Sequence, residues 1–172
     1  MSARRAWTAA ALAVVLLAPA LALAAGYGGI EPGSTTQERV REMYGQPTTT
    51  TPKKIDGYDT TEWVYDGPRA PRGFVRMIVD FGLLAPDGFK PLVVRTVRLD
   101  PKPMIFAKPT VLDGWGIPDQ IGQQGKQDVF LYEKGLVITF DDAGTSAISM
   151  LFMVPQKLSV PDDLRTAPGQ KK

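Results

Sequence analysis

The stretch Val75-Arg76-Met77-Ile78-Val79-Asp80-Phe81 decides the fold, because every second side chain is apolar and charged residues occupy positions between them. Neighbouring side chains of a β-strand point to opposite faces, so this alternation predicts a half-buried strand. The predicted inward residues are Val75, Met77, Val79 and Phe81. The predicted outward residues include Arg76 and Asp80. The stretch therefore indicates a sheet with one face on a core.

The segments on either side of this strand are predicted from the same kind of pattern. Trp63 and Tyr65 are two positions apart, which is the spacing of one strand face. After the predicted turn Asp87-Gly88, the run from Leu92 to Leu99 is rich in β-branched residues and predicts another strand. The segment from Thr48 to Lys54 has too few apolar residues to pack, and we predict a polar connection there.

A short helix is predicted before each group of strands. Thr35-Thr36-Gln37-Glu38 offers a capping box for a helix near Thr36 to Tyr44, with Val40 on its apolar face. Pro109 to Trp115 is the second helix, since proline suits a first helical turn. Each helix ends in an aromatic-Gly-x-Pro corner, to which we assign a structural role. The corner residues are Tyr44, Gly45, Pro47, Trp115, Gly116 and Pro118.

The second half of the sequence shows the same order of elements as the first. Strand patterns near 129–132, 136–140 and 147–154 follow the second corner, as 63–65, 75–81 and 92–99 follow the first. We predict an α+β fold of two tandem units, each with a short helix or helices followed by a three- to four-stranded antiparallel meander. A chance match between two generic stretches is the alternative. The predicted boundaries are 1–24 for a signal peptide, 25–29 for a flexible mature N-terminus, 30–101 and 102–155 for the two units, and 156–172 for a flexible tail.

The N-terminus has the features of a cleaved secretory signal peptide. Arg4 and Arg5 precede an apolar run from Ala9 to Leu17, which is too short to span a bilayer. Small residues follow, and we predict cleavage after Ala24, with Ala22 as the alternative. An uncleaved membrane anchor is the competing interpretation. We expect an exported protein, in the periplasm or alternatively in the medium, with no integral membrane segment after cleavage.

The composition excludes several kinds of chemistry. The chain has no Cys and no His, which excludes disulfides, cysteine nucleophiles, Ser-His-Asp triads and imidazole metal ligands. Loss of Arg4 and Arg5 lowers the count of basic residues from 20 to 18, equal to the 18 acidic residues. No basic excess is left to bind nucleic acid. We predict no catalytic residue, no cofactor and no metal site.

A hydrolase that acts through carboxylates is the enzymatic alternative. Asp141 and Asp142 are adjacent in the sequence, and Asp113 and Asp119 flank the second corner. The run Asp141-Asp142-Ala143-Gly144 is sufficiently explained as a turn, because Asp accepts hydrogen bonds from nearby backbone and Gly takes positive φ.

The second half contains more apolar residues than one sheet face needs. If Phe130, Ile138, Ile148 and Phe152 face a core, a second apolar set faces the other way. We predict these residues to bind a partner: Val129, Leu131, Val137, Leu151 and Met153. Exposed contiguous apolar patches mark interaction sites on soluble proteins. The alternatives are packing against the other unit and self-association as a homodimer.

The segment Val40-Arg41-x-Met43-Tyr44-Gly45-x-Pro47 resembles small SmpA/OmlA-type lipoproteins of outer-membrane β-barrel assembly. In tandem, the pattern of helix, corner and meander is similar to the β-lactamase-inhibitor-protein-like fold. The chain departs from the lipoproteins in lacking their lipid-bearing Cys. The resemblance implies a non-enzymatic module that binds other proteins through its sheet. We therefore expect an exported protein-binding module of the cell envelope whose partner is an envelope protein, with a self-associating structural protein as the alternative.

Overall fold

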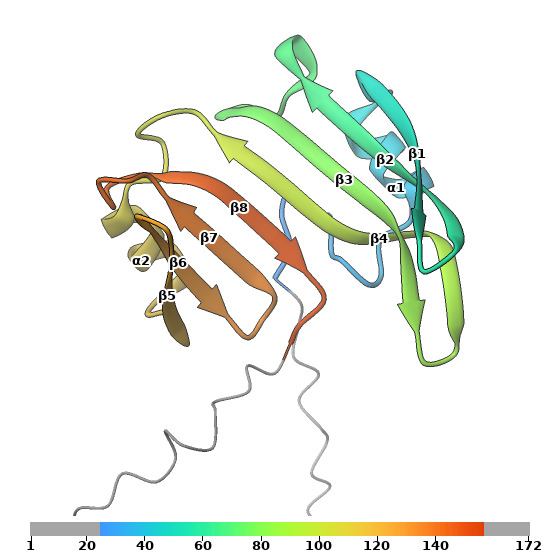
Figure 1. The fold of residues 1–172 in the computed structure, drawn as a ribbon. Coiled ribbons are helices and arrows are strands. Elements are labelled where there is room, and N and C mark those ends of the chain that lie inside the picture. The colour runs from blue at the N-terminus through green and yellow to red at the C-terminus, as the bar shows by residue number, and fades with distance from the viewer. Residues whose placement is uncertain (1–24, 157–172) are drawn as a thin grey trace, which may run out of the picture.

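The computed structural model describes residues 25–156. The predicted signal peptide, including Ala22 and Ala24, and residues 157–172 lie outside this range. The described chain forms one antiparallel sheet of eight strands with two short α-helices (Figure 1).

Along the chain, each α-helix is followed by four strands, and a short 3-10 helix, η1, lies between the second and third strands. Their bounds are α1 Gln37–Tyr44, β1 Thr49–Ile55, β2 Tyr58–Asp66, η1 Gly67–Arg69, β3 Phe74–Ala85, β4 Gly88–Pro101, α2 Lys108–Trp115, β5 Gln120–Gln124, β6 Gln127–Tyr132, β7 Leu136–Phe140 and β8 Ala147–Met153. The spatial order of the strands is β1-β2-β3-β4-β8-β7-β6-β5. All neighbouring strands are antiparallel.

The predicted fold class, two tandem helix-plus-meander units, is wrong. β4 pairs with β8 from Thr96↔Met153 to Leu99↔Met150, and this pairing joins all eight strands into a single sheet. Local alternation identifies strands, but it carries no information about pairing between distant strands. Separate units would leave β4 and β8 as exposed edges, whose unpaired backbone groups favour association. Their pairing removes both edges.

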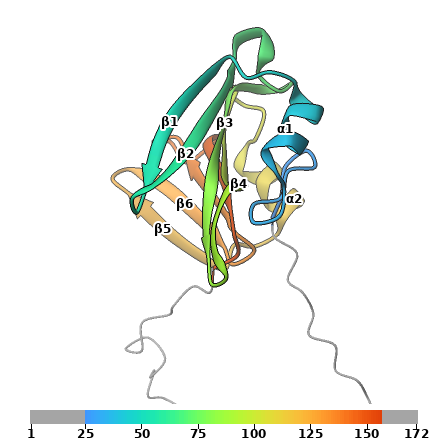
Figure 2. The same cartoon turned by 90° about the vertical axis from the view of Figure 1, so that its right-hand side faces the viewer.

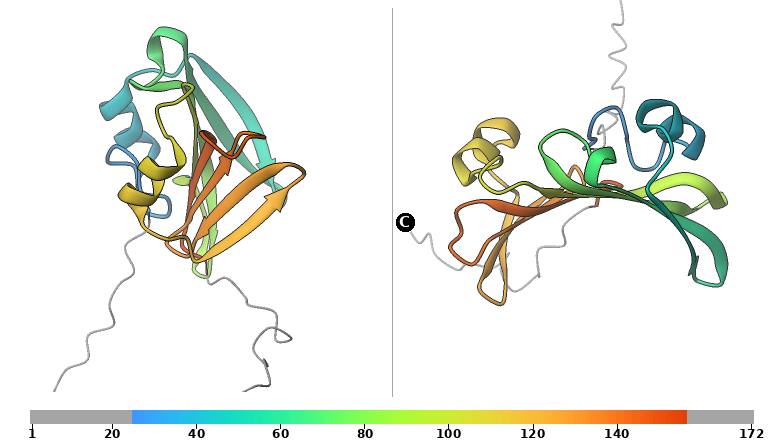
Figure 3. Two further views of the ribbon diagram at one scale, coloured as in Figure 1. Left: turned by 90° about the vertical axis from the view of Figure 1, so that its left-hand side faces the viewer. Right: turned by 90° about the horizontal axis from the view of Figure 1, so that it is seen from above.

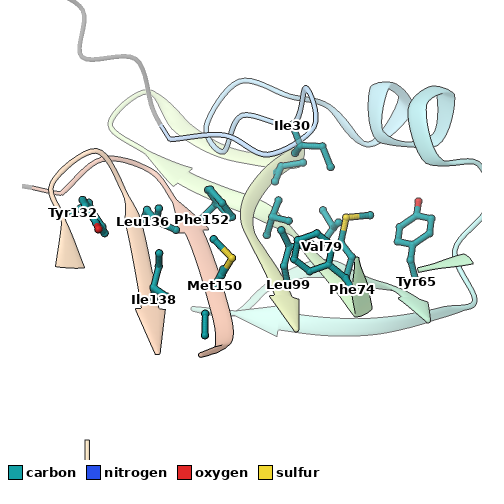
Figure 4. Packing of buried hydrophobic residues seen from close by; sticks show 14 of the residues in the cluster. Ile30, Tyr65, Phe74, Val79, Leu99, Tyr132, Leu136, Ile138, Met150 and Phe152 are labelled. Carbon is teal, nitrogen blue, oxygen red and sulfur yellow. The ribbon is translucent and has the colours of Figure 1, made fainter. Parts of the chain in front are cut away.

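The helices and the core lie on the same side of the sheet. Figures 2 and 3 show α1 and α2 covering one face, while the opposite face carries no helix. The core side chains on the covered face extend across the junction, where Leu99 of β4 is paired with Met150 of β8 (Figure 4). The largest fully buried side chains of the strands are Trp63, Tyr65, Met77, Phe81, Leu99, Leu136, Ile138, Phe140, Met150 and Phe152.

Two residues predicted to face the core are instead exposed. Val75 is 53% exposed and Ile148 is 41% exposed, whereas the adjacent Phe74 and Ala147 are buried. Register shifts occur between Phe74 and Arg76 and next to Phe140. A β-bulge inserts one extra residue into a strand, so the side that each following side chain faces is exchanged.

Strands also form at both edges of the sheet, where none was predicted. Residues 49–55 form β1 in place of the predicted polar connection, and residues 120–124 form β5. At the β1 edge, Asp56 and Gly57 have φ of 48° and 86°, as in a type I′ hairpin turn. The register then places the backbone nitrogen of Pro52 on the side away from β2, the one side where a strand tolerates proline.

Both predicted helices end at the glycine of their corner. Gly45 has φ of 73° and its N–H donates to the carbonyl oxygen of Arg41, while Gly116 has φ of 82° and its N–H donates to Leu112. This left-handed region favours glycine. A tyrosine from the adjoining sheet secures each corner. The hydroxyl of Tyr65 donates to the carbonyl of Gly45, and that of Tyr132 to the carbonyl of Gly116, both at 3.1 Å.

Residues 25–29, predicted from the sequence to be flexible, form a turn that contacts the core. The N–H of Ala25 donates to the carbonyl of Lys134 at 2.7 Å, and Tyr27 is bridged to Ile30. The ring of Tyr27 packs edge-on against Phe74, with the ring centroids 5.2 Å apart. This segment therefore covers the middle of the sheet between the two helices (Figure 3).

Substitution Tyr65→Phe should lower the free energy of unfolding by about 1 kcal/mol, because it leaves the carbonyl of Gly45 without its side-chain donor. Urea denaturation measures the change. Tyr58→Phe is the control, since that ring is 47% exposed and stacks on Phe89. A comparable loss in both variants would show that the corner hydrogen bond contributes nothing specific.

The stability should also fall at high pH. Burial raises the pKa of Tyr65 to about 12 from 10.0. As the pH rises, the tyrosine of the unfolded chain loses its proton first. The contribution of the protonated Tyr65 hydroxyl to the free energy of unfolding is therefore fully present below pH 10 and is lost between pH 10 and about 12. Denaturation at pH 9 and pH 11 should show a smaller loss for Tyr65→Phe than for the unsubstituted chain. Equal losses would contradict the role of this tyrosine.

Candidate protein-binding face

The face of the sheet without helices is built from residues in register across all eight strands. One row crosses the whole sheet through successive paired residues. From β1 to β5 it contains Thr49, Val64, Ile78, Arg98, Leu151, Val137, Leu131 and Gln120. Residues in register lie about 5 Å from their neighbours, so their side chains are close enough to form one surface.

The predicted partner-binding residues all lie on this face, in its half formed by β6, β7 and β8. Leu131 is paired with Val137, and Val137 with Leu151, so three apolar side chains are adjacent in one row. Val129 is paired with Thr139, and Met153 with Thr96, in the two neighbouring rows. Each of the five residues is partly buried and remains accessible. We call the face of the sheet without helices the open face. The five residues are the apolar half of this open face.

The apolar half does not lie between two packed units. The sheet is continuous, and the covering helices lie on its opposite side. The described chain therefore shows no interface between two separate units in which these residues could be buried. Binding to a partner and self-association both stay as predictions.

The other half of the open face, formed by β1 to β4, carries ion pairs on both sides of Val64 and Ile78 in its central row. Arg76 donates from Nε to Asp100 Oδ2 at 2.8 Å, and its second nitrogen lies 2.6 Å from the same oxygen. Lys53 pairs with Glu62 on the neighbouring strand. Such partly exposed ion pairs add little stability, about 0 to 1 kcal/mol each. Their effect here is to place paired positive and negative charges beside the apolar half.

Three of the four carboxylates considered for catalysis are engaged in local structure, whereas Asp113 is exposed on α2. Asp141 accepts from the backbone N–H and the hydroxyl of Thr145 at 2.7 and 2.8 Å, and the backbone hydrogen bond from Thr145 lowers the pKa of this carboxyl. Asp119 accepts from the backbone N–H of Glu133 at 2.8 Å. Asp142 accepts from the side chain of Gln127 at 3.3 Å. These contacts support turns and strand ends, as the turn interpretation of the sequence predicts.

The corner residues lie at the ends of the helices, on the covered side of the sheet. Tyr44 donates its hydroxyl hydrogen to the carbonyl of Gly28 at 3.1 Å, which ties the first corner to the N-terminal turn. Trp115 is 37% exposed, and its ring centroid lies 6.0 Å from that of Phe106. Pro118 is buried and Pro47 is partly buried. These contacts are consistent with the predicted structural role of the corners.

A cavity of about 390 Å³ was missed by the sequence analysis. Its lining includes Ile55, Leu83, Leu84, Arg95, Met153 and Val154. The cavity adjoins the open face, because Met153 also belongs to the apolar half. Arg95 reaches it from a register shift of β4 against β3, where Thr96 is paired with Asp80 and Val94 with Phe81. No local pattern in the sequence reports such a shift.

Among residues 25–156, no group of three or more His, Cys, Asp or Glu side chains is arranged to hold a metal ion. No helix in the same range is sufficiently long and apolar to cross a membrane.

No family model and no curated protein matches the chain. Among solved structures, the chain is similar to a DUF4309 family protein (YjgB) from Bacillus subtilis. The TM-score is 0.48 with 12% sequence identity, and the match covers 74% of this chain and 83% of that chain. A similarity this distant assigns neither a family nor a function to this chain.

Proposed function

We propose that this protein is an exported, non-enzymatic protein-binding module of the cell envelope that binds an envelope protein through the open face of its sheet. The observation that carries the proposal is the row Leu131, Val137 and Leu151. These side chains are adjacent and accessible, and no described element covers them. Burial of such a row by a partner removes apolar area from water, which contributes about 25 cal/mol per Å².

The half of the open face that carries the ion pairs suits the edge of such an interface. Protein interfaces combine an apolar centre with a polar rim, and the rim contributes to specificity. The transition occurs at the paired residues Arg98 and Leu151, where β4 meets β8. A partner that covers the apolar half would therefore meet paired charges along one side of its footprint.

Export rests on the sequence. Arg4 and Arg5, the apolar run and the small residues at Ala22 and Ala24 support a cleaved signal peptide. A periplasmic location is the proposal, with secretion into the medium as the alternative. The helix-corner segment Val40 to Pro47 supports a relation to SmpA/OmlA-type proteins, which also bind proteins in the envelope.

Self-association is the second candidate function. It is favoured by the same apolar row, because two copies can cover each other through a self-complementary patch. In that case the row would be buried in a homodimer and the protein would have a structural role in the envelope.

Substitution Leu151→Asp or Leu131→Asp should abolish capture of the partner by residues 25–172. A carboxylate in the middle of the apolar row would have to be desolvated when the partner binds. The measurement is affinity capture from an envelope extract, with the captured protein identified by mass spectrometry. Leu92→Asp is the matched control, because Leu92 is 58% exposed and is not part of the row. This variant should capture the same protein as the unsubstituted chain.

Light scattering coupled to size exclusion separates the two candidate functions. A monomer whose capture of one defined protein depends on Leu151 supports the binding module. A stable homodimer that Leu151→Asp converts to a monomer, without a captured protein, supports self-association. Both Asp variants should still unfold cooperatively. Loss of cooperative unfolding in both would show that these residues form part of the core, and the proposal would fail.

A further inference from the structure

The cavity at the end of the open face is lined by Arg95, whose side chain is 36% exposed and one of whose donors, Nε, lacks an acceptor. The Nε of Arg95 is fully buried and has no hydrogen-bond partner among the described residues. The nitrogen Nη2 lies 3.7 Å from Asp80 Oδ1, which is too long for a hydrogen bond. Buried donors in folded proteins nearly always have an acceptor, so an unpaired one calls for an explanation.

The carboxylate beside Arg95 is already engaged. Asp80 accepts from the hydroxyl of Thr96 at 2.9 Å, and its other oxygen also lies 3.8 Å from the amine of Lys53. Arg76 provides the comparison within the same sheet, because its guanidinium contacts Asp100 closely through two nitrogens. Arg95 makes no such contact. Its ion pair with Asp80 is looser, at 3.7 Å, so the guanidinium has donors that a further carboxylate could engage.

The remaining walls of the cavity are mostly aliphatic. The volume of about 390 Å³ falls in the range of sites that hold small molecules. The apolar wall is formed by Ile55, Leu83, Leu84, Met153 and Val154. A cation beside an aliphatic wall is complementary to a molecule with an anionic head and an aliphatic body. Asp56 and Asp80 near the same space repel anions, and they disfavour a dianion such as phosphate more than a ligand with a single negative charge.

We propose that this cavity binds a small amphiphilic carboxylate, with its head group on the guanidinium of Arg95 and its aliphatic chain against Leu83, Leu84 and Met153. The site is distinct from the row Leu131, Val137 and Leu151, and it shares one residue, Met153, with the apolar half. The ligand would supply a carboxylate acceptor to the exposed part of the guanidinium and would cover the aliphatic wall.

The test is isothermal titration calorimetry of residues 25–172 with sodium decanoate below its micelle-forming concentration. Decanol provides the neutral probe of the same chain length. Decanoate should bind the unsubstituted chain at least tenfold more tightly than decanol, and Arg95→Gln should abolish this preference. Arg98→Gln is the matched control, because it removes a positive charge from the same strand without altering the cavity lining. It should leave decanoate binding unchanged.

Several results would overturn the proposal. These are the absence of decanoate binding, equal binding of decanoate and decanol, and an equal effect of Arg95→Gln and Arg98→Gln. Arg95→Lys keeps the charge and should retain part of the preference for decanoate, which covers the case in which Arg95→Gln fails to fold. Tighter, Arg95-dependent binding of an acetylated peptide with a free C-terminal leucine would assign the site to a protein terminus and overturn the proposed ligand.

Discussion

The pairing of β4 with β8 is the interaction on which the rest of the structure depends. Four residue pairs, from Thr96↔Met153 to Leu99↔Met150, connect strands that are about fifty residues apart in the chain. They place Leu99 and Met150 in one core on the covered side. On the other side they place Arg98 beside Leu151. The continuous core, the open face and the cavity all require this junction.

The sequence predicted well those elements whose signal is local. Both helices begin within one residue of the predicted position and end at the predicted glycines, because caps and left-handed glycines act over a few residues. The central strands were also predicted, since one of their faces is apolar. The edge strands β1 and β5 were missed. They are polar, and they are held by backbone pairing to β2 and β6 rather than by burial of their own side chains.

The candidate site was predicted in part. Leu131, Val137 and Leu151 were selected by alternation alone, and the register places them next to one another. Arg95 could not be selected, because its position depends on a register shift between two strands. The same physical reason explains the exposure of Val75 and Ile148. A bulge leaves composition and periodicity almost unchanged while it alters which way a side chain points.

The two edges of the sheet have unequal capacity for growth. At β1 a strand added from outside would meet Pro52, which has no N–H to donate on that side, and the charges of Lys53 and Lys54 nearby. The strand β5, Gln120–Gln124, contains neither proline nor a charged residue. Extension of the sheet by a further strand is therefore directional. One end of the sheet is terminated by its own sequence, and a filament formed by strand addition could not propagate through both ends.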